Sequence, residues 1–146
     1  MVDADVLFAG AATASAVSAS AVVLRLAELT VLDGVVSAQV VREAERNLAA
    51  KVPAAVPAFR RLVAACVRTV PDPPAADAEA LAGLADPKDL PILVAAVREG
   101  CDVLVTFNVR DYRPGHAAVE VLTPGELVGR VRRQIAGPAA PPGPNA

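Results

Sequence analysis

Four carboxylates spread along the chain have the residue type and the local setting for hydrolytic chemistry. They are Asp3, Glu43, Asp89 and Asp111. Carboxylates that converge repel one another and need a cation, and an all-oxygen ligand set selects a hard divalent ion such as Mg²⁺ or Mn²⁺. Such an ion activates water and neutralises the charge that develops on a phosphodiester. The four acids therefore predict metal-assisted hydrolysis if the fold brings them to one place.

The stretch 86–112 contains two of these acids and has to position both. Asp86 is expected to cap a helix that carries Asp89 in its first turn. This helix has almost no polar face, so we expect it to be buried, and Gly100 is expected to end it. Residues 101–106 form a short apolar run, which is typical of a strand covered on both faces. A buried helix followed by a buried strand indicates an α/β fold.

Polar side chains follow this predicted strand, at Thr106, Asn108 and Asp111. Open parallel sheets bind ligands outside the carboxyl ends of their strands, so the location favours a functional site. The helix start also has a purely structural interpretation, because Asp86 and Asp89 are ordinary capping residues favoured by the helix dipole. Taken alone, the stretch favours capping, and the rest of the chain has to shift that balance.

Composition limits the classes of function. The 146 residues suit one domain with a sizeable core. The aromatic content of 3% argues against base stacking as the main mode of binding. The net charge of −2 gives no global attraction for nucleic acid, so any such contact has to be local or aided by bound metal. Cys66 and Cys101 form neither a disulfide framework nor a zinc-site spacing, which suits a reducing cytoplasm.

The apolar start of the chain does not have the pattern of a signal peptide. It lacks a basic segment and carries Asp3 and Asp5 instead. Arg25 and Glu28 interrupt the best candidate for a membrane-spanning run. We therefore expect a cytoplasmic protein with no membrane partner.

The remaining hydrophobic patterns alternate between strands and helices. Strands are expected at 2–8, 35–36, 67–70 and 119–122, a loop at 10–13, and helices at 16–29, 38–51, 54–67, shortly before residue 84 and after residue 123. Ser37 and Thr123 are expected to cap the helices that follow them. This alternation predicts a three-layer α/β/α sandwich with a central parallel sheet. Residues 1–136 are expected to form one domain, and the Pro-rich residues 137–146 a disordered tail.

Five short motifs resemble those of the PIN-domain family of metal-dependent nucleases. In chain order they are VDADVLFAG, SAQVVREAERNL, DPKDLPILVAAV, LVTFNVRDY and VEVLTPGELV. Each motif is weak by itself. Together, in the right order, they cover roughly residues 2–135, and capping alone no longer explains them easily. The resemblance implies a PIN-like, Rossmann-like topology.

The resemblance also implies a role for each polar position. Asp3, Glu43 and Asp89 are implied as ligands of Mg²⁺ or Mn²⁺, and Asp111 as a further catalytic acid. The auxiliary positions are Asp5, Asp86, Thr106 and Asn108. Arg110 and Arg113 flank the same edge and are candidate phosphate contacts, although a solvated surface charge explains them equally well.

Three positions leave alternatives open. Asp5 stands where the family usually has asparagine, and its extra charge either tightens metal binding or alters its stoichiometry. At the fourth motif, Asn108 can orient water or a ligand, in which case Asp111 only fixes the loop. A glutamate beside an apolar stripe, as Glu43 is, usually reaches water or pairs with arginine.

The resemblance implies cleavage of single-stranded RNA. Many bacterial relatives are toxins of toxin–antitoxin pairs, so the expected partners are an RNA substrate, a cognate antitoxin and a second copy of the chain. The alternative is a catalytically weak module of the same fold that binds nucleic acid or regulates. A receiver domain is disfavoured because it needs a lysine near the last strand, and the only lysines are Lys51 and Lys88. A dinucleotide-binding fold is disfavoured because no G-x-G-x-x-G follows the first predicted strand.

Overall fold

The computed structural model describes residues 1–12 and 17–137. Its elements are α1 (Ala4–Ala12), α2 (Ala19–Glu28), β1 (Val35–Ser37), α3 (Ala38–Lys51), η1 (Pro53–Ala55), α4 (Val56–Cys66), β2 (Arg68–Val70), α5 (Ala75–Ala80), α6 (Leu90–Arg98), β3 (Val103–Val105), η2 (Val109–Tyr112), β4 (Glu120–Leu122) and α7 (Pro124–Ala136). Residues 138–146 of the predicted tail lie outside the described residues.

Two pairs of short strands are joined by the backbone of residues 1–3. β1 pairs with β2, and β3 pairs with β4, both in parallel. Val2 N donates a hydrogen bond to Val35 O at 2.8 Å, and Asp3 N donates one to Val105 O at 3.0 Å. Val2 also forms a parallel bridge with Val105. The hydrogen-bonded order across the layer is therefore β2, β1, residues 1–3, β3 and β4.

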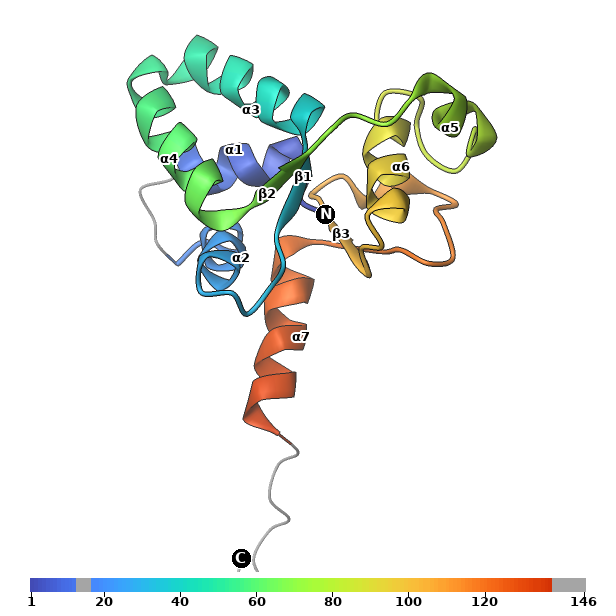
Figure 1. The fold of residues 1–146 in the computed structure, drawn as a ribbon. Coiled ribbons are helices and arrows are strands. Elements are labelled where there is room, and N and C mark those ends of the chain that lie inside the picture. Colours follow the sequence, from blue (N-terminus) through green and yellow to red (C-terminus); the bar gives the residue numbers. More distant parts are fainter. Residues whose placement is uncertain (13–16, 138–146) are drawn as a thin grey trace, which may run out of the picture.

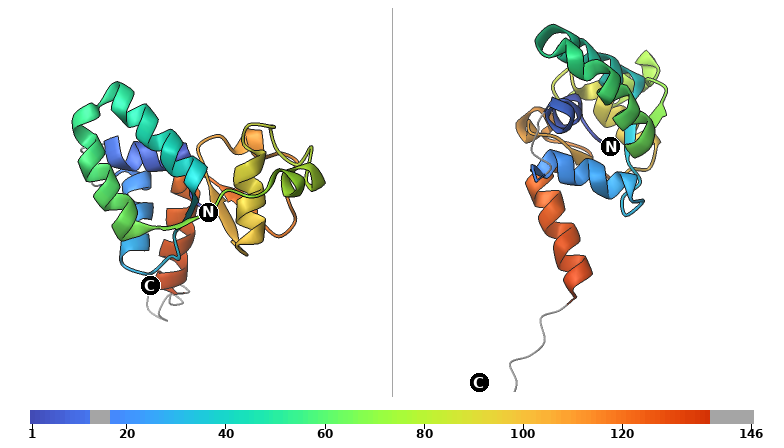
Figure 2. Two further views of the ribbon diagram at one scale, coloured as in Figure 1. Left: turned by 45° about the horizontal axis from the view of Figure 1, so that its top comes forward. Right: turned by 90° about the vertical axis from the view of Figure 1, so that its left-hand side faces the viewer.

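Helices cover both sides of this central layer (Figure 1). α1, α2, α3 and α4 pack against one another on one side, and α6, with α5 against it, lies on the other. α7 packs against α2 and extends away from the strands (Figure 2). These layers confirm the predicted α/β sandwich with parallel strands, although the sheets are small.

The predicted first strand at 2–8 is wrong from Ala4 onward, because the chain enters α1 directly after Asp3 and only Val2 forms a strand-like bridge. Asp3 Oδ1 accepts a hydrogen bond from Ala4 N at 2.6 Å, and Asp3 O accepts one from Leu7 N at 3.1 Å. Asp5 lies in the first turn, where a negative charge interacts favourably with the helix dipole. The acids that alternate with apolar residues therefore begin a helix and do not interrupt a strand.

Most other elements lie where the hydrophobic pattern predicts them, with shifted ends. The predicted loop at 10–13 belongs to α1 as far as Ala12, and residue 13 lies outside the described residues. The predicted second helix begins at Ala19, after the cap Ser18, and residue 16 lies outside the described residues. The predictions for β1, α3, α4, β2, β4 and α7 are confirmed, and Ser37 caps α3 as expected.

α6 is the buried helix of the central stretch. It begins at Leu90, later than predicted, because a turn precedes it in which Asp89 N and Leu90 N donate to Asp86 O at 2.9 and 2.8 Å. Residues 92–96 are buried. Gly100 follows the last turn with φ of 64°, a conformation that costs glycine little, so its predicted role is confirmed. Neither α6 nor any other helix of the described ranges is long and apolar enough to span a membrane.

A reciprocal pair of hydrogen bonds closes the start of α7. Thr123 Oγ1 accepts from Glu126 N at 3.3 Å, and Glu126 Oε2 accepts from Thr123 N at 2.8 Å. This capping box satisfies two backbone N–H groups that have no partner within a helix. It fixes where the chain leaves β4.

Replacing Thr123 by alanine is expected to lower the free energy of unfolding by about 1 kcal/mol, because the cap hydroxyl is lost. Urea denaturation followed by circular dichroism measures the change. Thr123→Ser keeps the hydroxyl and serves as the control. An equal loss of stability in both variants would contradict the capping role.

Candidate active site

Asp3 is the most buried acid at the carboxyl ends of the strands. Its side chain is 7% exposed, and the backbone holds it between Val105 and the start of α1. Its Oδ1 accepts from Ala4 N at 2.6 Å, and its Oδ2 accepts from the Tyr112 hydroxyl at 2.7 Å. Tyr112 is 1% exposed, and burial together with the Asp3 charge raises the pKa of its hydroxyl, which therefore stays protonated as a donor. Asp3 is thus fixed at both carboxylate oxygen atoms.

Asp5 connects α1 to the loop that follows β3. Its Oδ2 accepts from Phe107 N at 3.0 Å and from both Thr106 Oγ1 and Asn108 Nδ2 at 3.2 Å. Its Oδ1 is buried without a hydrogen bond. Burial, then the neighbouring charge of Asp3, raise the pKa of Asp5 from 3.8 to about 6, and the bonds from residues 106 and 107 only partly offset this. Thr106 and Asn108, two of the predicted auxiliary residues, therefore contact Asp5, which is another of them.

A second group of charges surrounds the turn before α6. Lys88 Nζ lies 3.7 Å from Asp89 Oδ2 and 3.4 Å from Asp111 Oδ2. Asp86 Oδ1 accepts from Lys88 N at 3.1 Å, and Asp86 N donates to Asp111 O at 2.6 Å. Burial raises the pKa of Asp89 to about 6; Lys88 opposes this shift, while the charges of Asp3, Asp111 and Asp86 add to it. These carboxylates are therefore near enough to repel one another.

Glu43 and the two arginines make no recorded contact with the acids. Glu43 is half-buried in α3, between the buried Val40 and Ala44, and forms no hydrogen bond or ion pair with a described residue. Arg110 and Arg113 are exposed and likewise have no ion-pair partner in the described part of the chain. The structure thus gathers Asp3, Asp5, Asp86, Asp89, Thr106, Asn108 and Asp111, and leaves the roles of Glu43, Arg110 and Arg113 as predictions.

The donor chemistry of this cluster fits a hard divalent cation. Asp5 Oδ1 and Asp89 Oδ2 are buried carboxylate oxygen atoms without a hydrogen bond, and Asp89 Oδ2 has only the distant Lys88 ammonium, at 3.7 Å. Such atoms are costly to bury unless a cation or a donor binds them, and oxygen ligands suit Mg²⁺ and Mn²⁺. Within residues 1–12 and 17–137, however, no three acidic, histidine or cysteine side chains are grouped closely enough to hold an ion as placed. The ligand atoms are of the type that binds Mg²⁺ or Mn²⁺, but in the described residues they are not close enough together to coordinate an ion.

Two residues of this site, Tyr112 and Lys88, were not among the predicted functional residues. Tyr112 donates to Asp3, and Lys88 pairs with Asp89 and Asp111. A signal existed for Tyr112, because a tyrosine in a folded core usually needs a partner for its hydroxyl. Its partner could not be identified, since Asp3 lies 109 positions away in the sequence. For Lys88, the signal was its position between two acids.

Replacing Tyr112 by phenylalanine is expected to weaken Mn²⁺ binding about 10- to 100-fold, the usual effect of removing a donor that orients a metal ligand. The free energy of unfolding should fall by about 1 kcal/mol, because Asp3 Oδ2 loses its hydrogen bond. Isothermal titration with MnCl₂ and urea denaturation measure the two effects. Lower stability with unchanged Mn²⁺ affinity would mean that Tyr112 serves only the core.

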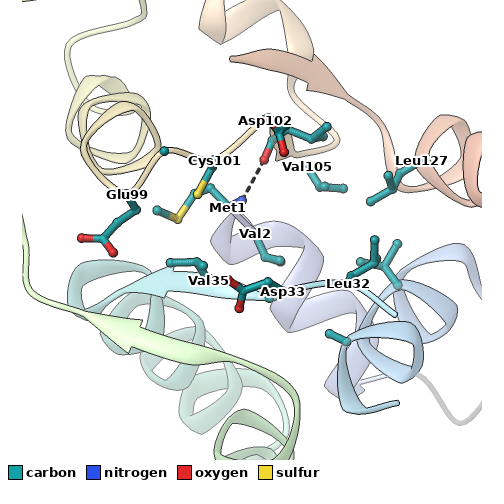
Figure 3. A pocket seen from close by; sticks show the side chains of 15 residues that line it. Met1, Val2, Leu32, Asp33, Val35, Glu99, Cys101, Asp102, Val105 and Leu127 are labelled. Carbon is teal, nitrogen blue, oxygen red and sulfur yellow. Dashed lines mark hydrogen bonds between the residues drawn. The ribbon is translucent and has the colours of Figure 1, made fainter. Parts of the chain in front are cut away.

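A cavity of about 220 Å³ lies at the opposite edge of the layer, among the residues that precede β1 and β3 (Figure 3). Its lining includes the apolar side chains of Val2, Val35 and Leu127 and the acids Asp33 and Asp102. None of the predicted site residues lines it. The cavity and the acid cluster are therefore separate features, at the amino and carboxyl ends of the strands.

Comparison with known proteins agrees with this geometry. A family model described as a PIN domain matches residues 1–110, which is 110 of the 146 residues. The matched region contains Asp3, Asp5, Glu43 and Asp89, and ends just before Asp111. No curated protein and no solved structure matches the chain. With its α/β layers and its acids at the carboxyl ends of the strands, the chain belongs to the PIN-domain family, whose fold is of the nuclease type.

Proposed function

We propose that this chain is an endoribonuclease that depends on Mg²⁺ or Mn²⁺ and hydrolyses phosphodiester bonds of single-stranded RNA. One observation carries the proposal: the buried Asp3 and the half-buried Asp5 and Asp89 meet at the carboxyl ends of the strands, and Asp5 Oδ1 and Asp89 Oδ2 lack a hydrogen bond there. A protein retains such costly, mutually repelling groups where they serve a function. The nuclease-type fold of the family supports the same reaction class.

In this proposal, Asp3, Glu43 and Asp89 hold the ion. When bound, the ion supplies activation of water and neutralisation of charge on the phosphate. Asp111 orients the attacking water and accepts its proton. Tyr112 keeps Asp3 in one orientation through the 2.7 Å hydrogen bond to Oδ2.

The loop after β3 has a positioning role in the same proposal. Thr106 and Asn108 donate to Asp5 at 3.2 Å, so they hold the loop against α1. Exposed Arg110 and Arg113 follow this loop and supply positive charge for the phosphates on either side of the cleaved bond. Asp86 fixes the turn before α6 by accepting from Lys88 N.

Two protein partners belong to the proposal. PIN nucleases often pair with an antitoxin, and we propose such a cognate antitoxin and a homodimer for this chain. Co-expression with the neighbouring open reading frame, followed by copurification, tests the antitoxin. Light scattering of the purified chain tests the dimer, and a monomeric mass at all concentrations would exclude it.

A catalytically weak binding module is the second candidate. The observation in its favour is that no three ligand side chains are grouped within the described ranges, so the site as placed is not closed around an ion. Such a module binds RNA without turnover. Cleavage and binding therefore have to be measured separately.

The test of the proposed function is cleavage of a labelled RNA pool by the purified chain with Mg²⁺ or Mn²⁺, beside reactions with EDTA. The Asp3→Asn variant is expected to lose cleavage. Asp33→Asn, which removes an exposed acid at the opposite edge of the layer, is the matched control and should cleave as the wild type does. Cleavage that survives in both EDTA and Asp3→Asn would refute the proposal, and RNA binding without cleavage would favour the second candidate.

Glu43 requires a separate test, because no contact in the structure supports its role. Since Glu43 has no hydrogen-bond partner among the described residues, Glu43→Gln should leave the thermal midpoint unchanged. As a metal ligand, the same substitution should abolish cleavage and weaken Mn²⁺ binding. Unchanged Mn²⁺ affinity would remove Glu43 from the ligand set without affecting the rest of the proposal.

A further inference from the structure

Phe107 is the one exposed aromatic side chain of the chain. The sequence has three phenylalanines, one tyrosine and no tryptophan, all at described positions. Phe59 and Tyr112 are each 1% exposed, and Phe8 is half-buried with Lys51 Nζ 5.1 Å from its ring centre. Phe107 is 50% exposed. In a chain with so few aromatic residues, this one is kept out of the core.

The backbone of Phe107 is fixed to the acid cluster. Phe107 N donates to Asp5 Oδ2 at 3.0 Å. The residues on either side are held as well, because Thr106 Oγ1 and Asn108 Nδ2 donate to the same oxygen atom and Asn108 N donates to Thr106 Oγ1 at 3.0 Å. A side chain on a fixed backbone loses little entropy when it binds a ligand. The backbone that carries the Phe107 ring is therefore held rigidly against Asp5.

Other exposed hydrophobic residues do not share this setting. Val17 precedes α2, Leu29 and Val31 follow it, Val52 follows α3, and Ile135 lies in the last turn of α7. Isolated exposed hydrophobic residues are common and need no explanation of their own. The distinguishing feature of Phe107 is an exposed aromatic ring on a residue whose backbone N–H binds Asp5.

We infer that Phe107 stacks against an unpaired base of the nucleotide next to the cleaved phosphodiester. The inference rests on the proposed function, because it takes the carboxylates as the position of that phosphate. Every base has a π-face, so an aromatic platform binds bases of any sequence. In a duplex both faces of each base are covered by its neighbours, and the platform therefore selects single strands. One such platform is compatible with the low aromatic content, since metal and phosphate contacts supply the remaining affinity.

The test is the binding of a short fluorescein-labelled oligouridine, measured by anisotropy in the Asp89→Asn background, in which cleavage during the titration should be about 1000-fold slower. Phe107→Ala is expected to weaken binding about 5- to 50-fold, the range for the loss of one stacked base. Phe107→Trp should bind at least as tightly as the parent. Ile135→Ala, which removes an even more exposed hydrophobic residue from the end of α7, is the control and should not change the affinity.

Abasic oligonucleotides distinguish stacking from a general change in the loop. A series of oligonucleotides is used, each lacking the base at a different position. For one of them, the loss of affinity for the parent protein should equal the loss that Phe107→Ala causes with the intact oligonucleotide. In the Phe107→Ala variant, that abasic position should cost nothing further. Equal affinities of parent and variant, absence of RNA binding, or abasic effects of the same size in both proteins would each overturn the inference.

Kinetics separate this inference from the proposed function. If the wild type cleaves RNA and Phe107→Ala cleaves with unchanged kcat/KM, the nuclease stands and the stacking role fails. If the wild type binds RNA in a manner sensitive to Phe107 but never cleaves it, the stacking role stands and the proposed function fails. The expected result for both together is a higher KM in Phe107→Ala with a small change in kcat.

Discussion

Replacing Asp89 by asparagine is expected to reduce RNA cleavage about 1000-fold, equal to about 4 kcal/mol of transition-state stabilisation, because a proposed metal ligand is lost. The same substitution should raise the free energy of unfolding above pH 6. Asp89 Oδ2 is buried without a hydrogen bond, and the charges of Asp3, Asp111 and Asp86 repel it. Removing its charge relieves this repulsion, while Lys88, which is largely exposed, loses only a weak ion pair at 3.7 Å.

A loss of cleavage together with a gain in stability would distinguish a functional acid from a helix cap. As a cap, Asp89 would stabilise α6, and its replacement would cost about 1 kcal/mol. Its side chain makes no capping hydrogen bond, so we expect a gain of about 1–2 kcal/mol instead. Single-turnover cleavage and urea denaturation measure the pair of effects. A destabilised variant that still cleaves RNA would return Asp89 to a structural role.

The matched control for Asp89 lies at the other end of the same helix. Asp77 accepts a hydrogen bond from Arg98 in the last turn of α6, and both side chains are partly exposed. Asp77→Asn therefore removes a carboxylate that touches α6 without entering the acid cluster. We expect unchanged cleavage and a change in stability within about 0.5 kcal/mol.

Without metal, the protein is expected to become less stable as the pH rises from about 4 to about 6. The pKa values of Asp5 and Asp89 are raised from 3.8 to about 6 in the folded chain. Between these values the folded state holds protons that the unfolded chain has released, so the slope of stability against pH is negative between about pH 4 and pH 6. Chemical denaturation in EDTA at a series of pH values measures this slope.

Divalent metal should restore the lost stability only at pH values at which the carboxylates of Asp5 and Asp89 are charged. At about 100-fold excess over its dissociation constant, Mn²⁺ is expected to add about 2.7 kcal/mol of stability above pH 6. Below that pH, protons compete for the same oxygen atoms and the gain should disappear. Stability that rises with pH in EDTA, or an equal gain from Mn²⁺ at all pH values, would contradict the proposed ligands.

Two glutamates change the stability with pH in the opposite direction, and their contribution has to be subtracted from the measured pH profile. Hydrogen bonds from Arg130 and Thr123 lower the pKa values of Glu120 and Glu126, so these glutamates add stability as the pH rises through their lowered values. Their contribution is shared by the wild type and Asp89→Asn. The difference between the two pH profiles therefore isolates Asp89.

Elements specified by local signals could be predicted from the sequence. Ser37 and Thr123 accept from the backbone three residues later, and a cap of this kind depends only on neighbouring residues. Gly100 ends α6 for a similarly local reason, since its positive φ suits glycine. The order of strands and helices follows from hydrophobic period, which is why the α/β class was predictable.

The prediction of the first strand failed because its hydrophobic pattern is compatible with both a strand and the start of a helix. Asp3 and Asp5 alternate with apolar residues, as in a strand whose polar face is exposed, but also suit the first turn of a helix. The chain pairs with β3 only as far as Asp3, whose N–H donates to Val105 O and whose side chain binds Tyr112, and the helix begins at the next residue. Neither Val105 nor Tyr112 is near Asp3 in sequence. The same limit applies to Asp5, whose partners lie more than 100 positions away.

Which acids meet was predictable only in part. Placing Asp3, Asp89 and Asp111 at the carboxyl ends of strands follows from the rules of parallel sheets. The position of Lys88 between two carboxylates depends on a turn before α6 whose shape the sequence did not reveal. Glu43 depends on how α3 is rotated against α1, and its role stays a prediction.

The contacts of Asp5 with residues 106–108 close a loop of about one hundred residues, and this has a consequence for how the chain matures. Pairings between distant residues form late, because the entropy of loop closure is lost before the contacts compensate for it. During synthesis, Asp3 and Asp5 leave the ribosome about one hundred residues before Thr106 and Tyr112, which emerge after most of the domain. A nascent chain therefore cannot assemble the acid cluster until nearly all of its core is present, which separates translation of the protein from the appearance of its site.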